Sequence, residues 1–311
     1  MRYKSLLFSI ILFSVFAVSQ STAKPSSADA NVHSEMLVST KWLAGHLKDP
    51  NLVILHGGGG SMGGGFLDYK RGHIPGARFL DESKMMVSVG QLNSEMPSPA
   101  DLQKLFSDLG ISDSSHVVIY STSWMPIAAR AYLTLDYIGF KGQASLLDGG
   151  IEQWLNEDRP VTTEVPKFAP ASLTIHLNEN VRTLYEEVKT IVDAKPGEEL
   201  AQIVDARPAR RYTQGHISGA TNMYWMDTLV SADDPVFQSP EKLRALYAQR
   251  GIVPGKKVIT YCEVGQQASH AYFLAKYLGY DVAMYDGSYQ EWDQVKKMPV
   301  VNGESKREEK K

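Results

Sequence analysis

The sequence predicts an α/β protein of two tandem domains, each a mainly parallel sheet flanked by helices. Short β-branched and aromatic runs alternate with helical patterns, which is typical of parallel sheets whose strands are connected by helices. A set of motifs also occurs twice in the same order, 138 to 143 residues apart. Solenoid repeats are shorter, about 20 to 50 residues each. Because 311 residues exceed what one core usually serves, each copy is expected to be a domain.

Residues 1–23 have the layout of a secretory signal peptide. Met1–Lys4 is basic, the stretch from Leu6 to Val18 is apolar, and Ser21–Ala23 offers small residues for cleavage. The alternative is an uncleaved anchor, but the apolar stretch is short for a membrane span. We therefore expect an exported protein, periplasmic or else secreted, with no stable membrane span once the signal is cleaved.

Four motifs define the two copies and suggest their boundaries. The first domain is expected at 24–165 and the second at 172–300, with a proline-rich junction near Arg159–Ser172. The last residues, 301–311, are rich in charge and are expected to be a disordered tail. The paired motifs are Arg71–Ala77 with Gln214–Ala220, Leu109–Ile111 with Arg250–Ile252, Val117–Ser121 with Val258–Cys262, and Leu147–Trp154 with Tyr285–Trp292.

The second copy shows the alternation of elements most clearly. Buried strands are expected where β-branched and aromatic residues run together, and helices where apolar residues recur every three or four positions. One helix should begin at Pro240, because proline is favoured in the first turn, and another should end before Gly279. In chain order, the expected elements are strand Gln202–Asp205, helix Pro240–Arg250, strand Val258–Tyr261, helix Ala268–Leu278 and strand Val282–Tyr285.

Cys262 is the single cysteine, and it stands between an expected strand and the following helix. Unpaired backbone N–H groups and the positive end of a helix dipole stabilise an anion at such a turn, and thiolate is the nucleophilic form of cysteine. A buried structural cysteine is the alternative. Asp205 also ends a strand, so it should lie at the same sheet edge, where parallel sheets bind ligands. One cysteine in an exported chain cannot form an internal disulfide, which indicates a free reactive thiol or an intermolecular partner.

Composition and motifs argue against several other functions. The net charge of −3 and the pI near 6.3 give no reason to expect nucleic acid as a partner. One cysteine rules out a zinc-type cysteine cluster, and we expect neither a metal nor a cofactor. The glycine-rich stretch Gly57–Gly65 lacks the Gly-Lys-Ser/Thr that follows in a nucleotide-phosphate loop, so it is interpreted as a flexible loop.

These features resemble the rhodanese family in its tandem two-domain form, the thiosulfate and 3-mercaptopyruvate sulfurtransferases. The resemblance implies two rhodanese-like domains, of which the second is catalytic and the first has lost its cysteine. Ser121 in the place of Cys262, and His56 in the place of Asp205, agree with that loss. The markers are the two Gly-His-Ile-x-Gly-Ala motifs, Val204–Arg207, the strand-cysteine-loop-helix segment 258–278, and Asp286–Ser288 followed by Glu291 and Trp292.

The resemblance also implies a sulfur-transfer site. The cysteine would take a sulfane sulfur from a small donor, become a persulfide, and pass the sulfur to a thiophilic acceptor such as cyanide or a thiol, including a protein thiol. Loop N–H groups that converge on the sulfur would stabilise its anionic forms. The expected site residues are Cys262, the loop residues Glu263, Val264, Gly265, Gln266 and Gln267, the donor-binding candidates Arg211 and Arg210, and the bracing residues Asp205 and Arg207.

Glu263 departs from the family pattern, which places basic residues after the cysteine in thiosulfate enzymes and small ones in mercaptopyruvate enzymes. An inward-pointing carboxylate would oppose thiolate formation and repel a dianionic donor, whereas one that points to solvent would do little.

His216 belongs to the repeated motif and is matched by His73 in the domain without cysteine, so we expect a structural histidine rather than an acid–base catalyst.

Two rival functions come from other classes. Phosphatases with a Cys-x5-Arg loop close it with an arginine that clamps phosphate, but the sixth residue after Cys262 is Ala268, so phosphatase chemistry is disfavoured. The second rival is an exported persulfide carrier that receives sulfur from a partner protein and turns over small donors poorly. The unusual loop is compatible with such a carrier, which stays open as the alternative.

Overall fold

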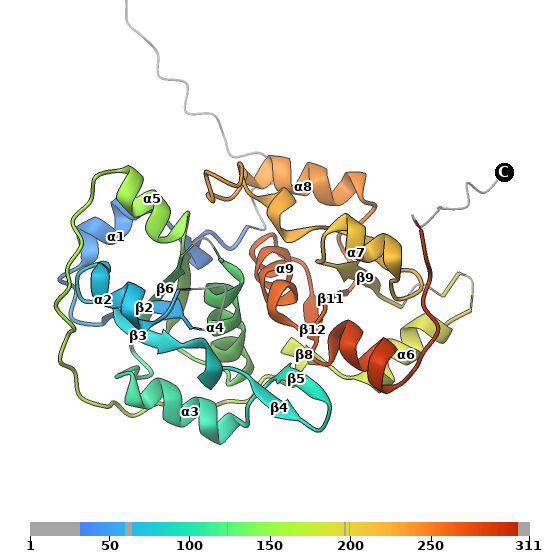
Figure 1. The fold of residues 1–311 in the computed structure, drawn as a ribbon, viewed down its shortest axis with the longest axis horizontal. Helices are drawn as coiled ribbons and strands as arrows, with labels where there is room; N and C mark the ends of the chain where they lie inside the picture. Colours follow the sequence, from blue (N-terminus) through green and yellow to red (C-terminus); the bar gives the residue numbers. More distant parts are fainter. Residues whose placement is uncertain (1–31, 60–63, 123, 196, 199, 304–311) are drawn as a thin grey trace, which may run out of the picture.

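The computed structural model describes residues 32–303, apart from 60–63, 123, 196 and 199. The expected signal peptide, 1–23, and residues 304–311 of the expected tail lie outside the described residues. Two lobes lie side by side in Figure 1, the first coloured blue to green and the second yellow to red. No helix in the described ranges is long and apolar enough to cross a bilayer.

The first lobe is built on a five-stranded sheet in which every pair of neighbours is parallel. The strand order is β1-β7-β6-β2-β3. The central strand β6 buries its apolar run, as expected for a strand covered on both faces. The strands are β1 Leu37–Val38, β2 Leu52–Gly58, β3 Arg78–Asp81, β6 His116–Ser121 and β7 Gln143–Leu147, and the helices are α1 Thr40–His46, α2 Phe66–Arg71, α3 Pro99–Asp108, α4 Pro126–Tyr137 and α5 Gly150–Asn156.

The second lobe repeats this arrangement. Its parallel sheet has the order β10-β9-β11-β12-β8, which matches the first sheet strand for strand when read from the opposite end. The predicted α/β class is therefore confirmed. The strands are β8 Arg182–Thr183, β9 Gln202–Asp205, β10 Thr221–Asn222, β11 Val258–Tyr261 and β12 Val282–Tyr285, and the helices are α6 Tyr185–Asp193, α7 Ala209–Gln214, α8 Pro240–Gln249, α9 Gln266–Tyr277 and the π-helical segment η6 Gln290–Val295.

The repeated Gly-His-Ile motif makes the same contacts in both lobes. The ring of His216 stacks on Tyr212 with centroids 3.8 Å apart, and its Nδ1 lies 3.0 Å from the Tyr212 carbonyl oxygen. His73 and Tyr69 form the equivalent pair, with the same centroid distance and a 2.8 Å hydrogen bond. Since one lobe contains the cysteine and the other does not, this geometry matches the expected structural role of His216.

The two lobes share an apolar interface formed by α4 and α9, which face each other at the centre of Figure 1. Tyr132 and Phe273 meet edge to face there, with ring centroids 5.0 Å apart. At the rim of this contact, the Tyr272 hydroxyl donates a 2.6 Å hydrogen bond to Asp136. The buried apolar cluster runs without a break from one lobe into the other, so the lobes are packed together rather than loosely tethered.

A two-stranded hairpin, β4 Val87–Val89 and β5 Leu92–Glu95, reaches from the first lobe to the second. In Figure 1 the hairpin extends below β8. The Asn93 N–H donates to Gln290 at 2.9 Å, and the Met96 N–H donates to Asp286 at 3.0 Å. The hairpin therefore contacts the segment that follows β12, at the edge of the sheet where Cys262 lies.

Backbone hydrogen bonds hold both the junction and the first residue of the expected tail to the lobes. No helix or strand occurs between α5 and Glu179 in the described chain, but the segment is held to the first lobe, where His176 N–H donates to the Ile138 carbonyl at 2.8 Å. The predicted disordered tail is wrong at its start, because Val301 pairs antiparallel with His216 through two 2.9 Å hydrogen bonds. This isolated backbone bridge satisfies the polar groups of Val301 and ties it to the second lobe.

The glycine-rich stretch is only partly a loop. Gly57 and Gly58 continue strand β2 and are buried, which corrects the interpretation of Gly57–Gly65 as a flexible loop. A methyl group added at Gly57 would lie 2.9 Å from the Ile127 side chain. The strand can therefore pass this close to α4 only because the residue has no side chain.

Candidate active site

Cys262 follows β11 directly, at the carboxyl edge of the second sheet. Its side chain is buried, with 1% of its surface exposed. The turn ends at Gly265, whose φ of 87° lies in the left-handed region that glycine adopts without strain. Helix α9 then starts at Gln266, two residues before the predicted start, because the chain turns into the helix at this glycine. The loop is therefore a tight turn from strand to helix around the sulfur.

Backbone N–H groups converge on the sulfur of Cys262. The donors belong to Val264, Gly265, Gln267 and Ala268, and all four favour the thiolate. Burial acts in the opposite direction and is the larger influence, so the pKa of the Cys262 thiol is raised above its ordinary value. The sequence predicted the anion-stabilising turn but not this desolvation, which comes from the apolar side chains packed around the loop.

The segment after β12 is hydrogen-bonded to the cysteine loop. The Cys262 N–H donates to the Ser288 hydroxyl at 3.3 Å, and the Tyr289 N–H donates to the Cys262 carbonyl at 2.9 Å. The Gln290 N–H donates to the Glu263 carbonyl at 3.0 Å. The Asp-Gly-Ser motif that the sequence singled out therefore helps to position the cysteine loop through the Ser288 hydroxyl, and the two residues after the motif do so through their backbone N–H groups.

Asp205 and Arg207 form a buried ion pair at the same sheet edge. Arg207 Nε lies 3.0 Å and 3.1 Å from the two carboxylate oxygens of Asp205, and Nη2 lies 2.7 Å from one of them. The guanidinium also stacks 3.9 Å from the ring centroid of Tyr289 and donates to the Gly215 carbonyl at 2.7 Å. With every contact directed at the protein, this geometry favours the expected bracing role.

Glu263 lies between the two orientations considered from the sequence. Its carboxylate is 3.3 Å from Nη1 of Arg207, while 42% of its side chain remains exposed. It therefore points neither at the sulfur nor freely into solvent. Of the remaining loop residues, Val264 and Gln267 are half-buried, and Gln266 contacts the sulfur of Met86 in the first lobe at 3.4 Å.

Arg211 and Arg210 are exposed on the short helix α7. Neither guanidinium is hydrogen-bonded or ion-paired to another residue in the part of the chain that the structure describes, and both side chains are exposed whereas Cys262 is buried. Both remain available to an anion that approaches from solvent, so the choice between them stays a prediction.

One residue near the site was missed by sequence analysis. Arg130 of α4 is buried in the interface between the lobes, with 1% of its side chain exposed. A methyl group added at Gly265 would lie 3.5 Å from Nη1 of Arg130. The available signal was a lone charged residue inside the apolar stretch Pro126–Leu135, since arginine is seldom fully buried without a partner.

The equivalent turn in the first lobe has different chemistry. Strand register places Tyr120 beside His56 and Tyr261 beside Asp205, which confirms that His56 takes the position of Asp205. Burial, reinforced by the charge of His73, lowers the pKa of His56 to about 4, so its ring is neutral at pH 7. The Ser121 hydroxyl donates to the Trp124 carbonyl at 3.1 Å. This turn therefore directs a carbonyl oxygen, rather than N–H groups alone, at the side chain.

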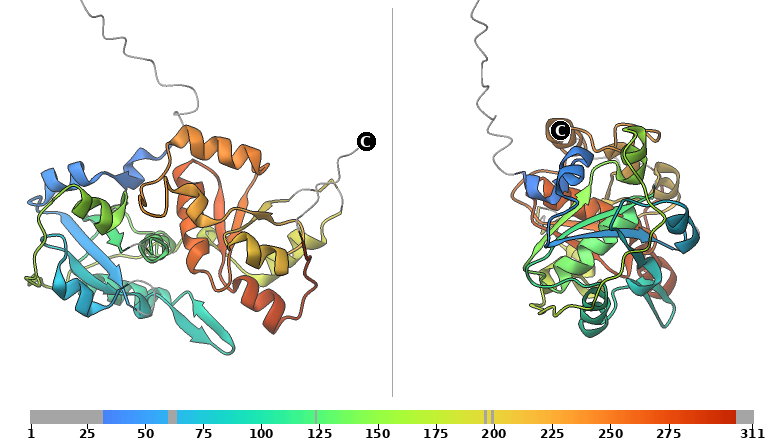
Figure 2. Two further views of the ribbon diagram at one scale, coloured as in Figure 1. Left: turned by 45° about the horizontal axis from the view of Figure 1, so that its top comes forward. Right: turned by 90° about the vertical axis from the view of Figure 1, so that its left-hand side faces the viewer.

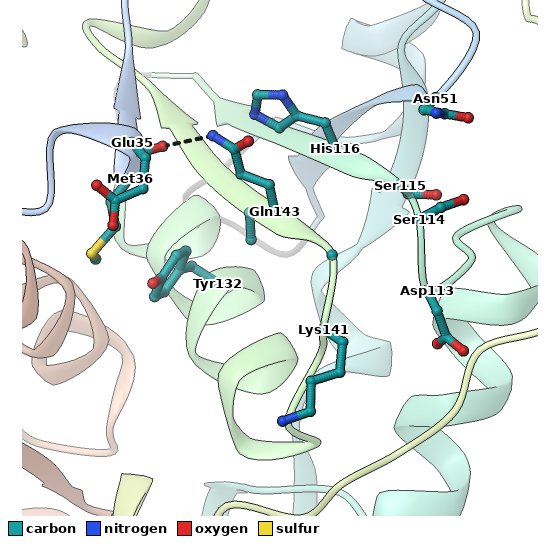
Figure 3. Close-up of a pocket in the computed structure, with 12 residues that line it drawn as sticks. Glu35, Met36, Asn51, Asp113, Ser114, Ser115, His116, Tyr132, Lys141 and Gln143 are labelled. Carbon is teal, nitrogen blue, oxygen red and sulfur yellow. Dashed lines mark hydrogen bonds between the residues drawn. The ribbon is translucent and has the colours of Figure 1, made fainter.

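A separate cavity of about 710 Å³ lies at the opposite edge of the first sheet (Figure 3). His116 and Gln143 stand at the starts of β6 and β7 and line it, and Gln143 donates to the Glu35 carbonyl at 3.3 Å. Because ligands of parallel sheets bind at the carboxyl ends of strands, this cavity is not part of the cysteine site. Within the described ranges, no cluster of three or more histidine, cysteine or acidic side chains could hold a metal ion.

Comparison with known proteins decides the family. A model of the rhodanese-like domain matches residues 39–157 and 186–294. This chain belongs to the rhodanese family. Among its curated relatives is a protein named sulfur carrier protein TtuD from Thermus thermophilus, 34% identical over 290 residues, which span 88% of this chain and 98% of the relative. The rhodanese prediction from the sequence is therefore confirmed.

Two further rhodanese relatives carry enzyme names. Thiosulfate sulfurtransferase from Rattus norvegicus is 33% identical over 273 residues, covering 82% of this chain and 91% of the rat protein. The crystal structure of SseA from Escherichia coli, described among the 3-mercaptopyruvate sulfotransferases, matches with a TM-score of 0.72 and 27% identity. It covers 82% of this chain and 98% of SseA, so both lobes take part in the match.

Proposed function

We propose that this rhodanese is a sulfurtransferase that carries sulfur as a persulfide on Cys262. The observation that supports it most is the convergence of four backbone N–H groups on a buried, single cysteine at a strand-to-helix turn. Such donors stabilise negative charge on sulfur in a site from which water is excluded. The relatives named as sulfurtransferases support the same reaction class.

The reaction has two half-steps that leave the enzyme unchanged. In the first, the Cys262 thiolate attacks the outer sulfur of a donor, the bond from that sulfur to the rest of the donor breaks, and the leaving group takes the electron pair. The group that leaves would be sulfite from thiosulfate, and from 3-mercaptopyruvate it would be the enolate of pyruvate, which becomes pyruvate by taking up the proton that the donor thiol loses. In the second, an acceptor thiolate or cyanide attacks the outer persulfide sulfur and Cys262 departs as the thiolate. The cysteine sulfur is an anion before the first half-step and again after the second, and the loop N–H groups stabilise this anion and the anionic persulfide between them.

The mass of the purified protein tests this proposal. After incubation with thiosulfate or 3-mercaptopyruvate, the intact mass should rise by about one sulfur atom, and a reductant should remove the addition. Cys262→Ser is the control, and it should gain no mass and lose sulfur transfer because a hydroxyl is a much weaker nucleophile. Transfer that persists in Cys262→Ser would refute the assignment, since the chain has no second cysteine.

The second candidate is a persulfide carrier with little turnover of small donors. The relative named sulfur carrier protein is the observation that favours it. The partners would then be a protein that loads Cys262 and a protein thiol that unloads it. A steady-state assay with small donors separates the two functions, because an enzyme produces many equivalents of product per protein whereas a carrier stops after one.

We also propose that the protein is exported, on the basis of the basic start, the apolar run and the small residues within positions 1–23. Terminal sequencing of the protein recovered from an exported fraction should give a chain that begins near Lys24. Recovery of the full-length chain only from inside the cell would contradict this localisation.

A further inference from the structure

A guanidinium group from the first lobe lies against the loop that holds Cys262. Arg130 belongs to α4, the helix that faces α9 across the interface (Figures 1 and 2). The position of a methyl group on Gly265 would be 3.5 Å from Nη1 of Arg130 and 3.6 Å from Met284. Because the Gly265 N–H is one of the donors to the cysteine sulfur, the guanidinium lies next to a residue of the sulfur cradle.

Neutral groups hold Arg130 in place. Nη2 donates to the Ser94 carbonyl at 2.8 Å, Nε donates to the Met85 carbonyl at 3.4 Å, and Nη1 lies 3.8 Å from the Met284 sulfur. The two carbonyls belong to the hairpin region of the first lobe. These contacts orient the group but leave its positive charge to be balanced elsewhere.

The buried negative charge near Arg130 is shared. Asp286 lies 3.7 Å from Arg130 and 3.8 Å from Arg182, so one carboxylate faces two guanidinium groups. Burial and the charges of Asp286 and Glu291 raise the pKa of Glu95 to about 8, against the opposing charges of Arg130 and Arg182. The outer charges are paired at the surface, Arg182 with Glu179 at 3.9 Å and Glu291 with Lys296 at 3.9 Å.

The ionised sulfur of Cys262 adds a further negative charge that acts on Arg130. Burial lowers the pKa of Arg130, and the charges of Asp286, Glu95 and Cys262 each oppose that shift. Coulombic stabilisation is mutual, so a cation that is stabilised by the thiolate also stabilises the thiolate. On the outer side of the loop, Arg207 and Glu263 are paired with each other at 3.3 Å.

We propose, on the basis of the persulfide function above, that Arg130 is a positioning residue of the Cys262 site: its buried guanidinium stabilises the thiolate and persulfide forms of the cysteine sulfur. Arg130 is too buried to contact a donor that arrives from solvent. The first lobe has no cysteine of its own, yet it contributes a charge to the reaction of the second lobe. The interface between the lobes is thus part of the active site.

The ultraviolet absorbance of the thiolate, followed across pH in reduced protein without donor, tests this role. Because Cys262 is the single cysteine, subtracting the spectrum of Cys262→Ser isolates its titration. Arg130→Met should raise the titration midpoint by about one pH unit or more, which is a tenfold loss of thiolate at a fixed lower pH. Arg130→Lys keeps the charge and should restore most of the midpoint.

Two further variants keep the test decisive. Arg130→Gln retains N–H donors for the two carbonyls and replaces Arg130→Met if that protein does not fold. Arg182→Met is the matched control, since it also removes a guanidinium from Asp286 but from β8, away from the loop, and should leave the midpoint unchanged. An unchanged midpoint in a folded neutral Arg130 variant, or an equal shift in Arg182→Met, would overturn the proposal. Because no donor is present, either result leaves the sulfurtransferase assignment to be judged separately.

Discussion

Glu263 determines the charge that a donor meets beside Cys262. Arg207 carries one positive charge and faces two carboxylates, the buried Asp205 and the partly exposed Glu263. The three groups together therefore leave one negative charge at the outer side of the loop. A negative charge there is expected to disfavour a dianion such as thiosulfate more than a singly charged or protein-bound donor.

Removing the Glu263 charge should shift donor preference. We expect Glu263→Gln to raise kcat/KM for thiosulfate, and Glu263→Arg to raise it several-fold at low salt, with smaller changes for 3-mercaptopyruvate. Steady-state assays at two ionic strengths measure both ratios. The gain should shrink as salt screens the interaction.

A control variant distinguishes local from general charge effects. Glu187→Gln changes the net charge by the same amount as Glu263→Gln but on α6, where Glu187 pairs with Lys257 at 3.0 Å. It should leave the ratio of the two donor activities unchanged. If Glu263→Arg also leaves that ratio unchanged at low salt, donor choice is set by residues outside the loop.

Arg211 and Arg210 are the two exposed candidates for binding the anionic donor. If Arg211 holds the anionic donor, Arg211→Ala should raise the donor KM by the equivalent of about 1.5–3 kcal/mol, because one charge-assisted hydrogen bond is lost. Thermal stability should change little, since the side chain is exposed. Arg210→Ala is the matched neighbour on the same helix. A KM effect in Arg210→Ala alone would transfer the role to Arg210.

Among the elements, the turn between β11 and α9 is the one that determines the geometry of the sulfur site. It changes direction within a few residues because Gly265 adopts a φ of 87° and places its N–H toward the sulfur. A side chain at this position would also lie 3.4 Å from the Asp286 carbonyl oxygen and 3.5 Å from Arg130. The glycine therefore serves both the backbone conformation and the close approach of neighbouring groups.

Gly265→Ala should lower both stability and sulfur transfer. A left-handed conformation at a residue with a Cβ costs roughly 1–2 kcal/mol, and relief of that strain would move an N–H away from the sulfur. Gly255→Ala is a matched control, because Gly255 has a φ of 84° and open space around its Cα. Chemical unfolding should show similar losses for both variants, but only Gly265→Ala should slow persulfide formation. Equal transfer rates in the two variants would show that the Gly265 conformation is unimportant for the sulfur site.

Among the helices and strands, the sequence predicted those that depend on a local pattern of residues. Strands Gln202–Asp205, Val258–Tyr261 and Val282–Tyr285 have the expected bounds because each is a short buried apolar run with clear breaks around it. The hairpin β4–β5 was not predicted, since the three residues of β4 are exposed. Its position depends on contacts with Asp286 and Gln290 in the other lobe, which no local pattern contains.

At the scale of the whole molecule, the duplication was visible in the sequence but its consequence for the site was not. Repeated motifs at a nearly constant offset predict two similar sheets, and the matching strand orders confirm them. Which faces of the two lobes meet depends on apolar surfaces from α4 and α9 together. Arg130 and Gly265 are 135 positions apart in the sequence, so their proximity could be found only from the packed structure.

The duplication also allows a direct test of why the first lobe lacks a site. Ser121→Cys in a Cys262→Ser background places a thiol at the equivalent turn. We expect no sulfur to be retained on it, for two physical reasons. The Trp124 carbonyl accepts a hydrogen bond from Ser121 and would repel a thiolate there, and Pro126, at the first position of α4, has no N–H to donate.

The intact mass of the Ser121→Cys variant after incubation with donor, compared with the native protein and with Cys262→Ser alone, measures whether sulfur is retained. A labile sulfur on the introduced thiol would show that the turn of the first lobe still stabilises a persulfide. The loss of the cysteine alone would then explain why the first lobe is inactive.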